Sequence, residues 1–188
     1  MYQQPPPPPK NNTVLWIILA VVGVFICGGI AMFGAILFPV FQSAKSAATK
    51  TSALSNTKQS AIGLIIYASD NNDRLPPAEK WMDCAAPYIK NEDAYKSPNA
   101  VKEDPSAYGF AFRTELSRVD STLVEEPMDT AMIFDSTVVS RNAAAGLETL
   151  PDPARYMGTN MIGFLDGHAK ATTKEGALRL PPLKLLKK

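Results

Sequence analysis

The residues whose types could do chemistry are few. His168 is the only histidine and follows Asp166 by two positions. An aspartate beside a histidine is half of a hydrolase triad, and Ser136 or Ser140 would supply the nucleophile. The same letters fit a turn followed by a strand, because Asp-Gly is a strong hairpin signal. A triad depends on geometry that spacing does not give, so we favour the hairpin and predict no catalytic residue.

Metal ligands are equally sparse. A zinc site takes several His or Cys ligands, whereas the chain beyond the first apolar stretch has one His and one Cys, Cys84. The run Asp70-Asn71-Asn72-Asp73 offers oxygen ligands for calcium, but Leu75 and Trp81 stand where an EF-hand has Gly and Glu. We interpret the run as a turn that ends a helix, with a different calcium site as the alternative. The sequence therefore predicts no metal site and no cofactor.

A set of aromatic side chains could line a binding groove, together with the loop over residues 136–155. In a domain of this size aromatic residues mostly fill the core, so we predict a core for the set. Its members are Trp81, Tyr88, Tyr95, Tyr108, Phe110 and Phe112.

The elements that position these residues begin with an apolar block, Val14–Phe41, inside an uncharged stretch from Asn11 to Ala44. About 20 apolar residues cross a ~30 Å hydrocarbon layer as a helix. The block therefore predicts a transmembrane helix over residues 13–42, with membrane lipid as a partner. A cleaved secretory signal fits less well, because its apolar core is only ~7–15 residues long. Cys27 lies in this block, far from Cys84, so we expect no disulfide.

The rest of the chain divides by composition. Residues 1–12 form a polar tail whose prolines, Pro5–Pro9, make a stiff spacer or a ligand for a proline-reading module. Apolar residues such as Leu54 and Ile62 recur at helical spacing over residues 43–69, which predicts an amphipathic continuation of the first helix, with a kink at Pro39.

Beyond the helix we expect a small α+β domain over residues 70–177 and a basic tail over residues 178–188 that is solvated or touches an anionic membrane. Inside the domain, apolar runs bounded by turn residues predict four strands, a short helix and a loop. The strands are expected over residues 108–112, 131–135, 161–165 and 168–172, the helix within 80–90, and the loop over 91–107. The fold class is thus α+β, a long N-terminal helix packed on a small antiparallel sheet.

Charge is divided unevenly between the two parts. Residues 1–69 hold four lysines and no acidic residue, whereas residues 70–188 hold 15 basic and 18 acidic residues. A slightly acidic domain without a basic stripe argues against nucleic acid as a partner. The lysines that follow the apolar block mildly favour a cytoplasmic C-terminal domain by the positive-inside tendency.

Several local sequences, in this order along the chain, resemble type IV pilin-like proteins. The nearer resemblance is to bacterial pseudopilin-like proteins of the prepilin-type N-terminal cleavage/methylation group with an H-x9-DG C-terminal motif. The matching stretches include Ala35–Phe41, Thr51–Gln59, Tyr67–Asp70, Asp73–Pro77, Pro87–Asn91, Tyr108–Phe110 and Phe164–Lys170.

Departures from that family are as informative. Aligned on Pro39, the cleavage glycine of the family falls at Ile17 and its assembly glutamate at Val22. The family's frequent cysteines fall at Ala53 and Ser97. The histidine of the H-x9-DG motif falls at Tyr156, with nine residues between it and Asp166.

The resemblance implies a structural role in a type II secretion or type IV pilus-like system, with other pilin-like subunits as partners of the first helix. It also implies a single-pass protein of the bacterial inner membrane whose C-terminal domain is extracytoplasmic, against the mild lysine bias. The missing cleavage site and glutamate favour a permanently anchored accessory over a filament subunit. The alternative is a membrane-tethered extracytoplasmic domain that binds a ligand or an adhesion partner on a pilin-like scaffold.

Overall fold

The computed structural model describes residues 12–186, apart from the side chains of residues 13, 14, 27, 28, 30 and 31. The chain forms two compact units, residues 1–45 and residues 46–188. The proline tail predicted for residues 1–12 lies almost wholly outside the described residues.

Helix α1 spans Thr13–Asp70 and contributes to both units. It continues through Pro39, whose missing N–H leaves the Ala35 carbonyl without its helical donor. The helix ends at the acidic and amide run, as predicted. Asn72 and Asp73 take positive φ values of 54° and 59°, a conformation that Asn and Asp tolerate better than most residues.

The predicted transmembrane helix over residues 13–42 is wrong. Among the side chains that the structure describes, no helix is both long enough and apolar enough to cross a membrane. The predicted single-pass topology and inner-membrane localisation depended on that span, so both predictions are wrong as well.

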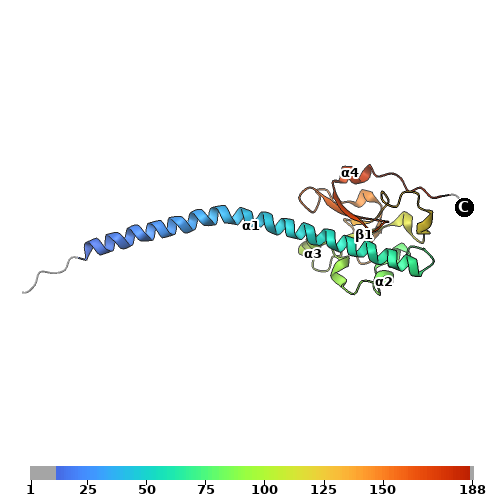
Figure 1. The fold of residues 1–188 in the computed structure, drawn as a ribbon, viewed down its shortest axis with the longest axis horizontal. Coiled ribbons are helices and arrows are strands. Elements are labelled where there is room, and N and C mark those ends of the chain that lie inside the picture. The colour runs from blue at the N-terminus through green and yellow to red at the C-terminus, as the bar shows by residue number, and fades with distance from the viewer. Residues whose placement is uncertain (1–11, 187–188) are drawn as a thin grey trace, which may run out of the picture. The chain divides into compact units, whose positions relative to one another are not determined.

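The second unit is α+β, as predicted, with the C-terminal part of α1 lying along one face of a five-stranded sheet (Figure 1). The strand order is β3-β1-β2-β4-β5. The strands are β1 Phe110–Arg113, β2 Ala131–Asp135, β3 Ala144–Ala145, β4 Asn160–Phe164 and β5 Ala169–Thr172.

The sheet is mixed, not antiparallel throughout. The four longer strands lie where the sequence predicts them within two residues, and they pair antiparallel. The unpredicted fifth strand, β3, pairs parallel with β1 through Phe112 and Arg113. Its two alanines carry no β-branched or aromatic signal, so only the pairing with β1 makes them a strand.

Short helices precede and follow the strands along the chain. Helix α2 is Trp81–Ala85, within the predicted range, and α4 is Lys174–Leu178. Helix α3, Pro98–Glu103, lies where a loop was predicted, and Pro98 occupies its first turn, a position that proline favours.

The core has two layers, one on each side of the sheet. The layer under α1 contains Leu64, Trp81, Phe110, Phe112 and Met161 among others. The layer on the opposite face contains Phe134, Ile162, Phe164, Leu150 and Ala177. Both faces of the sheet are therefore buried, which explains why β1, β2 and β4 are buried along their whole lengths.

Small residues of α1 face the sheet. Gly163 of β4 permits this close approach, because a Cβ there would lie 3.1 Å from Thr57 Cγ2 and 3.2 Å from Ala61 Cβ. Ile62, which the periodicity placed with the inward residues, is 40 % exposed. The buried residues of the helix in this unit are Ala53, Thr57, Ser60, Ala61, Gly63, Leu64 and Ala68.

The described part of the basic tail bonds to the domain through residues 184–186. Leu185 forms a β-bridge with Val124. The Glu125 N–H donates to the Lys184 carbonyl at 3.1 Å, and the Leu186 N–H donates to the Leu123 carbonyl at 2.7 Å. These bonds hold the tail against the domain, an outcome that composition alone does not predict.

Candidate functional site

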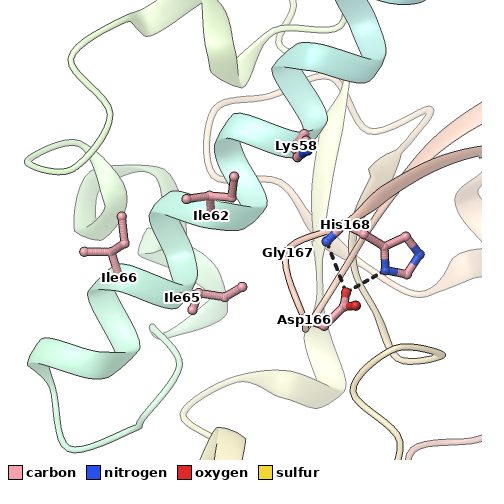
Figure 2. A pocket seen from close by; sticks show the side chains of 7 residues that line it. All are labelled: Lys58, Ile62, Ile65, Ile66, Asp166, Gly167 and His168. Atoms are coloured by element: carbon pink, nitrogen blue, oxygen red, sulfur yellow. Dashed lines mark hydrogen bonds and ion pairs between the residues drawn. The ribbon is translucent and has the colours of Figure 1, made fainter.

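A groove lies between α1 and the hairpin that joins β4 to β5 (Figure 2). Its volume is about 400 Å³. The helix contributes Ile62, Ile65 and Ile66 and, one turn earlier, Lys58. The hairpin contributes residues 166–168. One wall is thus aliphatic, and the other is largely backbone with polar side chains.

The predicted hairpin is confirmed, and its backbone shape forms the second wall of the groove. Gly167 has a φ of +90°, and its N–H donates to the Phe164 carbonyl at 3.0 Å. A glycine in the left-handed region is typical of a three-residue hairpin loop. A Cβ on Gly167 would lie 3.1 Å from Ile65 Cδ1 and 3.6 Å from Ile62 Cγ1. The loop backbone therefore lies directly against the isoleucines.

Asp166 orients His168. The carboxylate oxygen Oδ1 is 2.6 Å from His168 Nδ1 and accepts the His168 backbone N–H at 3.1 Å. The imidazole stacks on Phe164 with the ring centroids 4.2 Å apart and the planes 5° apart. Figure 2 shows the ring directed away from the three isoleucines. Asp166 and Phe164 therefore hold the His168 ring on the hairpin, on the side away from the isoleucines.

The hypothetical Ser–His–Asp triad does not form. Ser136 follows the end of β2 that lies beside Ile162 and Asn160, whereas His168 lies at the opposite end of β4, where Ala131 faces Phe164. The Ser136 hydroxyl instead donates to Thr149 Oγ1 at 2.9 Å and accepts the Val138 N–H at 3.0 Å. Ser140 lies farther along the same loop.

The predicted turn at residues 70–73 is confirmed, and its polar groups serve the fold. Asp70 accepts the Tyr88 hydroxyl at 2.9 Å, and the Asp73 carbonyl accepts the Ser121 N–H at 2.7 Å. Within the described part of the chain, no three His, Cys, Asp or Glu side chains gather as metal ligands would. Cys84 has a free, half-buried thiol, and the Cys27 side chain lies outside the described residues.

Four of the six aromatic residues fill the core, as predicted, whereas Tyr88 and Tyr108 are only half-buried. Trp81, Tyr95, Phe110 and Phe112 are fully buried. The Trp81 ring packs edge-on against Tyr95 at 5.8 Å and stacks with Phe112 at 6.3 Å. Its indole N–H donates to the Ala143 carbonyl at 3.0 Å, which ties α2 to the segment before β3.

Tyr108, the half-buried aromatic residue before β1, belongs to a surface network centred on Arg141. Arg141 pairs with Asp83 at 2.8 Å and with Glu92, and its guanidinium lies 5.5 Å from the centroid of the Tyr108 ring. Hydrogen bonds from Arg141 and Asn142 lower the pKa of Asp83. This network joins the loop over residues 136–155 to α2 and leaves Arg141 engaged within the domain.

A buried polar cluster lies at the other end of the sheet. Asp135 is completely buried and accepts the Ser97 hydroxyl at 2.7 Å and the Met161 N–H at 2.6 Å. Arg155 Nη1 lies 3.7 Å from the carboxylate, and the Tyr156 hydroxyl is 2.7 Å from Ser97 Oγ. Burial raises the pKa of Asp135 to about 6, although these hydrogen bonds and the guanidinium lower it.

Two members of this cluster are positions that the family resemblance singled out. Tyr156 occupies the place of the motif histidine and Ser97 that of a frequent cysteine, and the structure brings the two side chains into contact. Asp135 was not identified from the sequence. An acidic residue that ends an otherwise apolar strand was the available signal. The cluster joins α3, β2 and the loop before β4 and is closed to solvent, so its role is structural.

Comparison with known proteins gives no further assignment. No family model matches the chain, and no curated protein or solved structure matches it.

Proposed function

We propose that this chain is a pseudopilin-like structural or accessory subunit that packs laterally with other pilin-like subunits through the N-terminal part of α1. The observation that carries the proposal is the exposed apolar surface of that part of the helix. Large apolar patches exposed on a protein surface mark interaction sites, because their hydration is unfavourable.

The apolar surface covers most of the described turns of the first unit. Phe25 is 78 % exposed and Trp16 is 70 % exposed. Nothing lies within 4 Å of a Cβ built on Gly23 or Gly34, so another helix has room to approach closely there. No charged residue occurs between Asn11 and Ala44, so helix contact in this region would bury no unpaired charge.

The form of the subunit follows from two residues. Ile17 and Val22 stand where the resembling family has the cleavage glycine and the assembly glutamate. A chain without them lacks the processing signal and the carboxylate that sets the register of neighbouring subunits. We therefore favour an accessory subunit that keeps its N-terminal residues over a processed filament subunit.

Site-specific photo-cross-linking tests the lateral packing. A benzophenone amino acid replaces Phe25 in the chain expressed in its native cells, and in a matched control it replaces Leu178, which is exposed on the second unit. We expect adducts with a second copy or with a pilin-like protein from position 25 and none from position 178. Equal or absent adducts at the two positions would contradict the proposal.

Intact mass distinguishes the two forms of the subunit. A mass that corresponds to residues 1–188 is expected for the accessory form. Loss of the first 17 residues together with N-methylation would show that a processing peptidase accepts Ile17, and would favour a filament subunit.

A second candidate function is ligand binding on the same scaffold. The observation that favours it is the groove formed by Ile62, Ile65, Ile66 and the hairpin, which no described residue fills. The loop over residues 136–155 and the aromatic set, which the sequence assigned to this function, are instead engaged in the core and in the Arg141 network.

A further inference from the structure

The outer edge of β5 has unpaired backbone groups. In the described part of the chain β5 is the last strand of the sheet, and only β4 pairs with it. The Phe164 N–H donates to the His168 carbonyl at 2.9 Å, which makes this a hydrogen-bonded pair. Because such pairs alternate in an antiparallel ladder, Lys170 and Thr172 also bond inward, and the N–H and C=O groups of Ala169 and Ala171 point outward.

These outward groups have no partner among the described residues. Within residues 12–186, no turn, loop or side-chain hydrogen bond reaches the N–H or C=O of Ala169 or Ala171. Both residues are only half-buried. An unpaired edge of this kind is a template for another extended backbone.

The groove adjoins the hairpin end of this edge, because its lining ends at His168, the residue before β5. Thr57 and Ala61 of α1 lie against Gly163 of β4, and the groove continues from α1 to the loop that leads directly into β5. A strand added outside β5 would lie ~4.8 Å from it, with alternate side chains directed toward the helix. At the end of β5 that follows His168, those side chains would lie toward the groove, whose exposed residues on α1 include Ile62 and Ile66.

Charge selects the kind of occupant. Neither Lys58, in the groove, nor Lys170, on β5, forms an ion pair with a described residue. A second copy that paired antiparallel through both alanines would place Lys170 opposite the same lysine, and like charges directly opposite are destabilising. A partner strand with an acidic residue opposite Lys170 avoids this repulsion.

We propose that the β5 edge and the adjoining groove form a strand-addition site for an extended segment of a partner protein. The segment has aliphatic residues at alternate positions, which pack on Ile62 and Ile66, and acidic residues between them, which face Lys170. Backbone bonds to Ala169 and Ala171 supply affinity, and the groove supplies specificity. The inference deepens the ligand-binding candidate and is independent of lateral packing by residues 15–41.

A synthetic peptide of the expected pattern tests the site. The probe is rhodamine-labelled Thr-Ile-Glu-Val-Glu-Ile-amide, and its binding to the full chain is measured by fluorescence anisotropy. Amide hydrogen exchange of the complex is measured in parallel. We expect saturable binding, with added protection at Ala169 and Ala171 and little change at Lys170 and Thr172, whose N–H groups already bond to β4. A peptide that does not bind at millimolar concentration would overturn the proposal.

Variants locate the binding on the edge. Ala171→Pro removes an outward N–H but no bond to β4, and proline is tolerated on edge strands. We expect it to weaken binding about tenfold, as the loss of one well-formed hydrogen bond would. Ile62→Gln should also weaken binding, whereas the matched control Met128→Gln, at an exposed residue outside the groove, should not. Equal binding by all of these variants would overturn the proposal.

A charge exchange tests the orientation even if Ala171→Pro misfolds. The Lys170→Glu variant should bind the glutamate peptide more weakly than the original chain does, and it should bind a peptide with lysines in place of the glutamates. The original chain should prefer the glutamate peptide. Sedimentation of the unliganded chain tests the other occupant. A dimer that Lys170→Glu alters would assign the edge to a second copy and overturn the proposal. None of these outcomes bears on the cross-links from position 25.

Discussion

Asp135 is the residue with the most unusual environment in the described chain. It is completely buried at the end of β2, and its partners come from the segment before α3, from β4 and from the loop that contains Arg155. Burial disfavours the charged carboxylate and raises its pKa to about 6, and the surrounding donors only partly offset this effect. The cluster therefore links the pH of the solution to the stability of the domain.

Replacement of Asp135 by Asn should remove this pH dependence. The pKa of Asp135 is about 6 in the folded chain, against an ordinary value of 3.8, so the folded state binds the proton more tightly. The stabilisation of the folded state by this tighter proton binding is complete below pH ~4 and is lost as the pH rises through ~6. The free energy involved is on the order of 3 kcal/mol.

Urea unfolding of the original chain and of Asp135→Asn at pH 4.5, 6 and 7.5 measures the effect. The difference between the two free energies of unfolding should change across this range. Glu103→Gln, at an exposed carboxyl, is the control and should follow the original chain. Parallel profiles for all three proteins would show that Asp135 keeps its charge down to acidic pH.

At the scale of elements, α1 presents two different surfaces to its surroundings within the second unit. Its small residues pack on the sheet, and the isoleucines Ile62 and Ile66 remain on the surface beside the last hairpin. Periodicity predicted an amphipathic helix but assigned Ile62 to the buried side. The actual contact is decided by the close approach at Gly163, where only small side chains fit between the helix and β4.

Gly163→Ala should destabilise the second unit. The added methyl would lie 2.8 Å from Ile133 Cγ1 and within 3.2 Å of Thr57 and Ala61, so the helix and the strand must move apart. Overpacking of this kind costs roughly 1–3 kcal/mol. Urea unfolding followed by tryptophan fluorescence measures the loss.

Gly34→Ala is the matched control for this substitution, because nothing lies within 4 Å of its added methyl. It should leave the unfolding midpoint of the second unit unchanged. A Gly163→Ala variant as stable as the original chain would show that α1 can retreat from β4 at no cost.

At the scale of the whole molecule, the chain combines an apolar helical unit with a unit that has its own core. The buried residues of α1 that contact the sheet begin at Ala53, which lies beyond the boundary between the units at residues 45 and 46. The two units therefore need not depend on each other for stability, and the exposed apolar unit remains available for contacts with other chains.

Removal of residues 1–45 should leave the second unit folded. We expect the melting temperature measured by circular dichroism to change by no more than about 4 °C, the shift that ~1 kcal/mol produces in a domain of this size. A large loss of stability would show that the first unit supports the core.

Some features follow from the sequence alone. The long helix, its end at Asp70, the four principal strands and the hairpin at Asp166-Gly167 are all encoded by local patterns of apolar and turn residues. The burial of Trp81, Phe110 and Phe112 follows from their size and apolar surface. Such features depend on neighbours within a few positions, so they can be predicted without a fold.

Other features exist only in the tertiary structure. Strand β3 is made by its pairing with β1, and the Asp135 cluster is made by segments that lie far apart along the chain. The separation of Ser136 from His168 is set by strand direction, which rules out the triad that spacing allowed. The groove likewise requires α1 and the last hairpin to meet. Contacts between distant segments depend on packing geometry, which periodicity along the chain does not specify.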